Sequence, residues 1–417
     1  MKIKKTFFLL SLVGTLVGGC SKEEISGLSS IGFPKSNEIY YSTSDGNYLD
    51  LESYDWYKNS IKSHKRVNDS IFILNFIQDI NKIEKMFFYG CSSLTGITIP
   101  NSVKEIESEA FNGCRSLKNF TIPEGVTTIN RSTFAGCSSL TNITIPNSVK
   151  EIGGGAFEGC SSLTSITIPN SVKEIGNGAF SDCSSLKNIT IPEGVATINW
   201  GTFNGCSSLT NVTIPNSVKT IDINAFADCK SLTNLTLPEG LTSLGAYVFL
   251  RTSINNLTIP QSVNKLSDGA FGGFLGTNII IHENLNIKRI PSECFSSCLN
   301  LTNITIPKSV EEIGFRAFSG CTSLEEITIP ENVTEIEWEA FTHCFKLKRV
   351  FCKSLVPPSI APIEDKYNLW EDYTPKPLFH REKGGKSLDI YVPLESVSAY
   401  KIAWNDYADK IIGYNFE

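Results

Sequence analysis

Cysteine is the residue type in this chain whose number and spacing could support chemistry. Thirteen cysteines occur among the 417 residues, and most of them recur at intervals of 23 residues. The regularly spaced members are Cys91, Cys114, Cys137, Cys160, Cys183, Cys206, Cys229, Cys298, Cys321 and Cys344. Thiols at a fixed period can form disulfides, hold a metal ion, or stack as small apolar groups in the interior of a repetitive fold.

The period favours stacking. A period in the twenties predicts a solenoid in which each repeat adds one coil. Neighbouring coils lie about 4.8 Å apart, so equivalent cysteines run parallel at that spacing, whereas the Cβ atoms of a disulfide lie about 3.5–4.5 Å apart. Two irregular cysteines fit burial as well, because Cys294 takes a slot usually filled by alanine and Cys352 takes a strand position equivalent to Ile145. We therefore expect a buried column of reduced thiols.

The sequence gives little indication of other residue combinations that could support catalysis or cofactor binding. The chain has no C-x-x-C pair, and its four histidines, His64, His282, His343 and His380, are scattered. Serine is abundant only because Ser-Ser precedes leucine in most repeats, and neither a G-x-S-x-G elbow nor a glycine-rich phosphate loop is present. Charged residues make up 19% of the chain, the formal charge is −6, and no basic patch occurs. We expect no enzyme activity, metal, cofactor or nucleic-acid partner.

Polar side chains that alternate with buried strand residues are the remaining candidates for binding. Asparagine and threonine repeat in two columns whose amides and hydroxyls could contact protein backbones or sugar hydroxyls. The candidate binding face consists of Asn119, Thr121, Asn142, Thr144, Thr167, Asn188, Thr190, Asn211, Thr213, Asn234 and Thr236. The alternative is that threonine is simply a good strand former and asparagine a tolerated neighbour.

The elements that position these side chains are visible in one repeat, residues 140–160. Ile143 and Ile145 alternate with polar residues, which predicts a short half-buried strand. Pro146 cannot donate to a ladder and ends this strand. The chain then returns inward through a short turn or helix that contains Phe157.

Phenylalanine occupies the same slot in twelve repeats, usually after a small residue. Twelve stacked rings, each burying about 150–250 Å², predict a continuous apolar core. These rings are Phe88, Phe111, Phe134, Phe157, Phe180, Phe203, Phe226, Phe249, Phe271, Phe295, Phe318 and Phe341.

The pattern LxxIxIPxxVxxIxxxAFxxC resembles the leucine-rich repeat, and its Ile-x-Ile-Pro and Ala-Phe-x-x-Cys parts are similar to the BspA-type repeats of bacterial surface proteins. The resemblance covers roughly residues 69–352. It implies an α/β-type solenoid, a leucine-rich repeat array of about 12–13 coils with a parallel β-sheet on the concave face and a cap at each end. It also implies adhesion to host extracellular-matrix proteins or other microbes.

The N-terminus predicts export. Lys2, Lys4 and Lys5 precede an apolar segment, residues 6–17, that is too short for a typical membrane span. Val17-Gly18-Gly19-Cys20 resembles a bacterial lipobox, which implies that residues 1–19 are a signal peptide and that Cys20 is lipidated. The alternative is an ordinary secretory signal with a chance cysteine. The sequence from Ser21 to Glu24 resembles outer-membrane retention and surface-export signals of Bacteroidetes lipoproteins, so the membrane contact would be the lipid alone.

We divide the remaining chain into a tether (20–36), an N-terminal cap (37–68), the repeats (69–352) and a C-terminal insertion and cap (353–417). Asp45-Gly46 predicts a hairpin in the N-terminal cap. The register slips between Phe249 and Phe271, where Thr252 replaces cysteine. This slip is either a tolerated loop insertion or a bulge that shapes a ligand site.

The sequence thus predicts a non-catalytic surface protein that binds host or microbial macromolecules. Two alternatives stay open: glycan capture by an accessory lipoprotein of polysaccharide uptake, and a structural envelope protein. Aromatic residues, which sugar binding generally favours, are absent from the Asn and Thr columns. Exposed clusters at Tyr54, Trp56 and Tyr57 or at Trp370 and Tyr373 would favour glycan binding.

Overall fold

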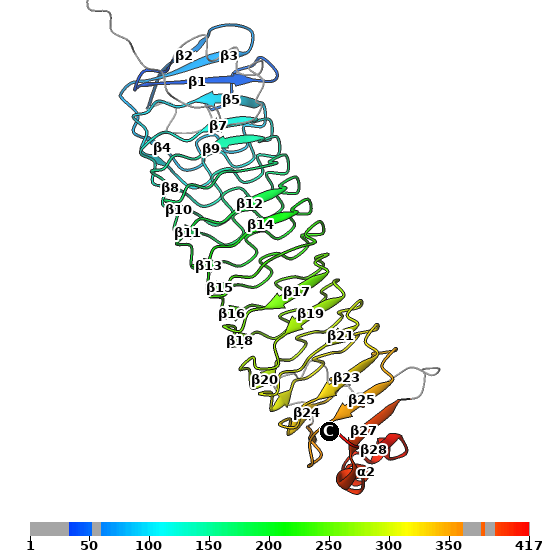
Figure 1. Ribbon diagram of the computed structural model, residues 1–417. Helices are drawn as coiled ribbons and strands as arrows, with labels where there is room; N and C mark the ends of the chain where they lie inside the picture. Colours follow the sequence, from blue (N-terminus) through cyan, green and yellow to red (C-terminus); the bar gives the residue numbers. More distant parts are fainter. Residues whose placement is uncertain (1–32, 52–59, 362–376, 380–387, 417) are drawn as a thin grey trace, which may run out of the picture.

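The computed structural model describes residues 33–51, 60–361, 377–379 and 388–416. It is a parallel β-solenoid of about 13 coils with repeats of about 23 residues (Figure 1). The fold class predicted from the 23-residue period is confirmed. Within the described ranges, no helix is long and apolar enough to cross a membrane.

The Ile-x-Ile-Pro segments form a first column of short parallel strands. Equivalent residues pair between coils, as Asn119 does with Asn142 and Asn188 with Asn211. These strands are β5 (Leu94–Thr98), β7 (Asn119–Thr121), β9 (Asn142–Thr144), β12 (Asn188–Thr190), β14 (Asn211–Thr213), β17 (Asn256–Ile259), β19 (Asn278–Ile281), β21 (Asn303–Ile304), β23 (Glu326–Ile329) and β25 (Arg349–Cys352). We call the surface outside this column the strand face.

A second column of very short strands follows the proline in most repeats. Its backbone pairs are also parallel and in register, as between Ile152 and Ile175. The strands are β4 (Lys82–Ile83), β6 (Glu105–Ile106), β8 (Thr128–Ile129), β10 (Glu151–Ile152), β11 (Glu174–Ile175), β13 (Thr197–Ile198), β15 (Thr220–Ile221), β16 (Ser243–Leu244), β18 (Lys265–Leu266), β20 (Arg289–Ile290), β22 (Glu312–Ile313), β24 (Glu335–Glu337) and β26 (Ser359–Ala361). The sequence did not predict this column, because two-residue strands are too short to show a period of two.

The third side of each coil is a turn segment, residues 153–159 and their equivalents. The backbone of this segment bonds to the next coil: Glu109 N–H donates to Arg131 O (3.0 Å) and Phe111 N–H to Thr133 O (2.9 Å). Successive turn segments are therefore held as closely as strands are. We call their outer surface the turn face. Among the described residues, no repeat contains a helix here, so of the predicted "turn or helix" the turn is correct.

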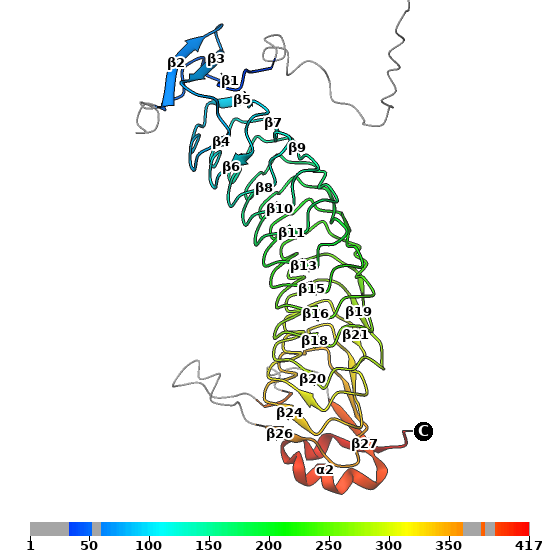
Figure 2. The same ribbon diagram turned by 90° about the vertical axis from the view of Figure 1, so that its left-hand side faces the viewer.

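The coil stack is bowed (Figure 2). In this view β5, β7, β9, β19 and β21 lie toward the right-hand edge. The solenoid of stacked coils is as predicted.

The interior consists of the predicted apolar columns. The twelve phenylalanine rings stack with centroids 5.1–6.2 Å apart and interplanar angles of 2–18°. Phe379, which lies in the C-terminal insertion, adds another ring at 5.5 Å from Phe341. The sequence did not reveal Phe379 because the insertion hides its register. Cys352 pairs with Ile329 in the strand column, as expected for its position.

The N-terminal end is covered by antiparallel strands. Strand β1 (Glu38–Thr43) lies between β3 (Ile71–Phe76) and β5, and β2 (Ile61–Arg66) pairs with β3. The hairpin therefore joins β2 and β3, not the residues around Asp45-Gly46, which turn without a returning strand.

The C-terminal end is closed by a strand, short helices and a last strand. β27 (Asp389–Pro393) pairs with β25 and β28 (Ile411–Tyr414), and α2 (Val397–Ala403) lies between η2 (Leu394–Ser396) and η3 (Asn405–Lys410). Trp404 is buried and its Nε1–H donates to Pro358 O (2.9 Å). This cap keeps the last coil from exposing its core.

Candidate functional site

The predicted binding residues all project from the strand face. Each is exposed except Asn119, which is half-buried, and buried or half-buried residues such as Ile189 alternate with them. Inter-coil pairing aligns like with like, since Thr190 lies opposite Thr213 and Asn188 opposite Asn211. The structure thus brings the residues into two straight columns, as the sequence predicted.

Local hydrogen bonds hold parts of these columns in fixed conformations. The Asn211 side-chain amide donates to Asn188 Oδ1 (2.7 Å), and Thr210 Oγ1 donates to Lys187 O (3.1 Å) in the preceding coil. Such ladders reduce the rotamer freedom that a bound partner would otherwise have to restrict. The middle of the strand face is therefore a rigid surface of amides and hydroxyls.

The outward residues of the strand face become aromatic at its C-terminal end. The register pairs Thr328 with Phe351, and Phe351 with Tyr391, so the threonine column continues as aromatic rings. The Phe351 and Tyr391 rings stack at 4.9 Å, and Tyr414 lies 5.8 Å from Phe351 and 5.6 Å from Tyr391. Phe416 packs on Tyr414 at 4.9 Å. We call these four residues the aromatic end.

The sequence reasoning missed the aromatic end. Phe351 follows Thr328 by 23 residues, so the repeat period contained the signal for its position. Tyr391 and Tyr414 lie beyond the insertion, where the period is lost, and only the β25–β27–β28 pairing places them here.

Charged pairs replace asparagine beside the aromatic end. Arg349 Nη2 lies 2.5 Å from Glu326 Oε2, and Lys348 Nζ lies 2.8 Å from Glu325 Oε2. Exposed pairs of this kind contribute little stability. Their effect is to balance charge, so the strand face carries no strong potential of one sign at this end.

The cysteine column is structural. In nine coils the thiol donates to the phenylalanine carbonyl of the preceding coil, as Cys114 Sγ does to Phe88 O (3.1 Å) and Cys160 Sγ to Phe134 O (3.2 Å). The described cysteines are free thiols, and all but Cys91 are buried. Burial raises the pKa of the Cys183 thiol to about 12. A thiol held protonated in this way is a poor nucleophile and a poor metal ligand.

One group of carboxylates lies close enough to suggest a cation site. Oxygen atoms of Glu312, Glu335 and Glu337 lie within 4.8 Å of one another. Arg289 already occupies this position, because its guanidinium contacts Glu312 and lies 2.7 Å from Glu337 Oε1. Glu337 also accepts the Phe315 N–H at 2.7 Å. The group is an ion-pair network that fastens neighbouring coils.

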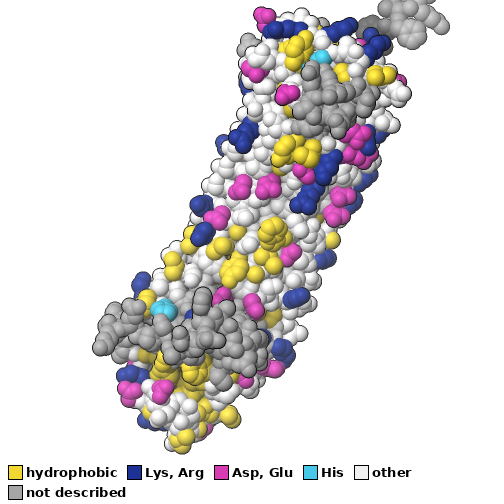
Figure 3. Space-filling model, turned by 180° about the vertical axis from the view of Figure 1, so that it is seen from behind, with side chains coloured by type: hydrophobic (Ala, Val, Ile, Leu, Met, Phe, Trp, Pro, Cys, Tyr) yellow, Lys and Arg dark blue, Asp and Glu magenta, His cyan; other side chains and the backbone are white. Residues whose placement is uncertain are grey.

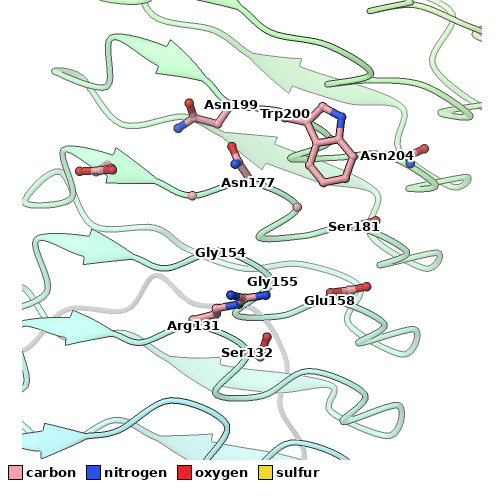
Figure 4. Close-up of a pocket in the computed structure, with 14 residues that line it drawn as sticks. Arg131, Ser132, Gly154, Gly155, Glu158, Asn177, Ser181, Asn199, Trp200 and Asn204 are labelled. Carbon is pink, nitrogen blue, oxygen red and sulfur yellow. The ribbon is translucent and has the colours of Figure 1, made fainter.

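A hollow of about 680 Å³ opens on the turn face between Arg131 and Trp200. Figure 3 shows the side opposite to the view of Figure 1, with hydrophobic side chains gathered near its middle. Figure 4 shows the hollow itself, in which Asn177 and Asn204 lie near Trp200 while Glu158 lies nearer Arg131. The sequence reasoning missed this hollow, although the run Gly153-Gly154-Gly155 was a signal for it.

The slipped register is accommodated within the core. Thr252 is fully buried, and its hydroxyl donates to Phe249 O (2.9 Å) within the same coil. The Phe249 and Phe271 rings still stack at 6.2 Å. The structure thus favours a tolerated irregularity over a ligand site.

Some predicted positions lie outside the described residues. They are Cys20, Tyr54, Trp56, Tyr57, Trp370, Tyr373 and His380.

Comparison with known proteins agrees with this geometry. Residues 59–184, 150–280 and 288–360 match the profile of the BspA type leucine rich repeat region. A leucine-rich repeat protein from Bacteroides ovatus has a similar solved structure, with 28% identity and a TM-score of 0.62 over 85% of this chain and 91% of that chain. A leucine rich cell surface protein from Faecalibacterium prausnitzii also shows 28% identity, with a TM-score of 0.40 over 70% of this chain and 86% of that chain. No curated protein matches the chain.

Proposed function

Because this chain belongs to the family of BspA-type leucine-rich repeat proteins, we propose that it is a non-catalytic cell-surface protein that binds other proteins through its strand face. The partners we propose are host extracellular-matrix proteins or proteins on other cells. One observation carries the proposal: the threonine column, which asparagine accompanies in the middle coils, continues in register into the aromatic end.

This arrangement has the composition of a protein interface. Tyrosine and phenylalanine are enriched in interface cores, where a few buried aromatic residues supply most of the binding energy. Tyr414 is 45% exposed in the free protein and therefore has apolar area left to bury. The rigid amide and hydroxyl columns beside it would supply hydrogen bonds and orientation at a small entropic cost.

We also propose that residues 1–19 are removed and that lipid on Cys20 anchors the protein to the outer membrane with the solenoid facing outward. The lipobox-like segment Val17-Gly18-Gly19-Cys20 supports this proposal. In a bacterial host fed a labelled fatty acid, the wild-type protein should be labelled and the Cys20→Ser variant should not. Labelling of both proteins would contradict the assignment.

The binding surface is tested with purified protein and immobilised matrix proteins such as fibronectin, fibrinogen and collagen. Replacing Phe351 and Tyr391 together by alanine should weaken binding at least about 10-fold, since interface aromatics commonly contribute more than about 1 kcal/mol each. Asn142→Arg combined with Thr167→Arg should weaken it by introducing two charges into the uncharged columns. The control is Asn224→Ala on the turn face, which should bind as wild type. Unchanged binding by both strand-face variants would show that the strand face is the wrong surface.

A further inference from the structure

We propose that the hollow beside Trp200 on the turn face is a binding site for a neutral oligosaccharide. The site is separate from the strand face and does not depend on the function proposed above. It rests on the aromatic wall of the hollow, on the amides beside that wall, and on its charge.

Trp200 forms the aromatic wall. Its side chain is 52% exposed at the edge of the hollow. Trp404, by contrast, is fully buried, as expected for an indole that stabilises the fold. An indole offers a flat apolar surface with one N–H donor. The C–H groups on one face of a pyranose ring pack against such a surface while its hydroxyls stay free for polar partners.

Amides lie close to this wall. Asn177 and Asn204 line the hollow near Trp200 (Figure 4). A carboxamide both donates and accepts, so it can pair with a hydroxyl in either direction or with two adjacent hydroxyls. Asn199 also lines the hollow, but its amide donates to Ile175 O (2.7 Å) and is held there as part of the coil. Asn177 and Asn204 are therefore the amides we assign to the ligand.

The charge of the hollow selects against acidic sugars. Its charged lining residues are Arg131, Glu158 and Glu174, which give one positive and two negative charges. A uronate or sulfate group would meet more repulsion than attraction, and a polyanion would gain no cluster of basic residues. Neutral hydroxyl-rich ligands fit this balance. Arg131 and Trp200 are three coils apart, about 14 Å at the usual strand spacing, which leaves room for more than one sugar ring.

Missing side chains open the hollow. The turn segment has two positions with positive φ in each coil, and at the first of them three consecutive coils hold Gly155, Gly178 and Gly201, with φ of 59–61°. The coils on either side hold Ser132 (φ 52°) and Asn224 (φ 55°) in the same conformation. The backbone of the repeat therefore accepts a side chain at this position. Gly178 and Gly201 leave open the space that such side chains would fill, whereas at Gly155 the Glu158 and Ser132 side chains already lie close.

The geometry at Gly178 makes this idea testable. A Cβ atom added there would meet only Ser181 Cβ, at 3.8 Å, so a longer side chain could extend into the hollow. Gly178→Glu should fill the hollow, and Asn224→Glu puts the same residue at the same coil position outside its lining. Trp200→Ala removes the aromatic wall, whose side chain is exposed.

The purified full chain is screened against neutral oligosaccharides (glucans, mannans, galactans and xylans), with heparin and polygalacturonate as acidic comparators. Titration calorimetry and Trp fluorescence then measure the affinity of each hit. We expect at least one neutral oligosaccharide to bind, with at least about 10-fold loss in Trp200→Ala and Gly178→Glu. Asn224→Glu, and the Phe351 and Tyr391 double alanine variant, should bind it as wild type does.

The proposal is overturned if no neutral oligosaccharide binds, if only the acidic comparators bind, or if Trp200→Ala binds as wild type. Thermal unfolding checks that each variant is folded. If Gly178→Glu does not fold, Trp200→Ala and Asn177→Ala decide the question, because both change exposed or half-exposed side chains. Loss of matrix-protein binding in the strand-face variants is a separate measurement, so either proposal can fail without the other.

Discussion

The strand face and the turn face are formed by the same coils, but they differ in how much their outward residues vary from coil to coil. The strand face repeats asparagine and threonine from coil to coil, as Asn188 and Asn211 illustrate, and its variation is concentrated at the aromatic end. The turn face changes at nearly every coil, as the sequence of equivalent residues Arg131, Gly154, Asn177 and Trp200 shows. A repeated surface suits a broad contact, whereas a locally varied one can form a compact site.

Backbone hydrogen bonding explains why the turn face can vary. The turn segments are joined through main-chain groups, such as Phe157 N–H to Ala179 O at 2.8 Å. These hydrogen bonds between coils do not require a particular outward side chain. On the strand face the outward residues must also suit a strand, which narrows the choice of residue type. We therefore expect the residue types to vary on the turn face, because main-chain groups are common to all residues.

The largest effect should come from the interior that both faces share. Phe157→Ala should lower the free energy of unfolding by about 3–5 kcal/mol, because it removes a fully buried ring from the stack and leaves a cavity. Urea denaturation measures this loss. Thr167→Ala, an exposed control on the strand face of the next coil, should change the stability by less than about 0.5 kcal/mol. Equal effects of the two variants would show that the ring column is not the common support of the faces.

A smaller effect on the free energy of unfolding should distinguish two kinds of glycine in the turn segments: those at which a Cβ atom would clash, and those at which it would meet open space. A Cβ atom at Gly176 would lie 2.5 Å from Gly154 N, so Gly176→Ala should cost about 3 kcal/mol through a backbone clash. Gly178 has room for a Cβ atom, so Gly178→Ala should cost only about 1 kcal/mol for its positive φ. Denaturation of the two variants compares these values. A larger loss in Gly178→Ala would contradict the division.

The smallest effect concerns the N-terminal cap, which covers the first strand of the strand face. Burial lowers the pKa of His64 on β2 to about 4 from its ordinary value of 6.5, and Tyr41 on β1 hydrogen-bonds to its ring. Because the folded-state pKa is depressed, the contribution of neutral His64 to stability is complete above pH 6.5 and is lost as the pH falls toward 4. Hydrogen exchange should show β1 and β5 losing protection over this range before the turn segments do.

His64→Gln is the control for this prediction, since it cannot be protonated. It should remove the difference between the two faces over the same pH range. Loss of protection at the same pH in both proteins would exclude His64 as the cause.

Much of the fold could be predicted from the 23-residue period. Because each coil adds the same residues at the same height, the Phe157 and Cys160 slots had to become columns, and the alternation around Ile143 had to become a strand. The second strand column could not be predicted, since its strands are too short to show a period of two. The β2–β3 hairpin depends on backbone pairing between segments that carry no period. The candidate binding face followed from alternation alone, whereas the aromatic end required knowing which strand pairs with β25.

The sequence by itself determined the repeat, the composition of the core and the residues that alternate outward, because these follow from local periodicity. Only the tertiary structure decided where the irregular residues meet. Trp200 is a single residue after Asn199 in the sequence, and it becomes the wall of a hollow that Gly155, Gly178 and Gly201, at the next position of three stacked coils, also line. Tyr391 and Tyr414 join Phe351 because parallel strands bring residues far apart in the chain to neighbouring positions. In a solenoid, a site forms where neighbouring coils carry different residues at equivalent positions. Those residues meet only when the coils are stacked.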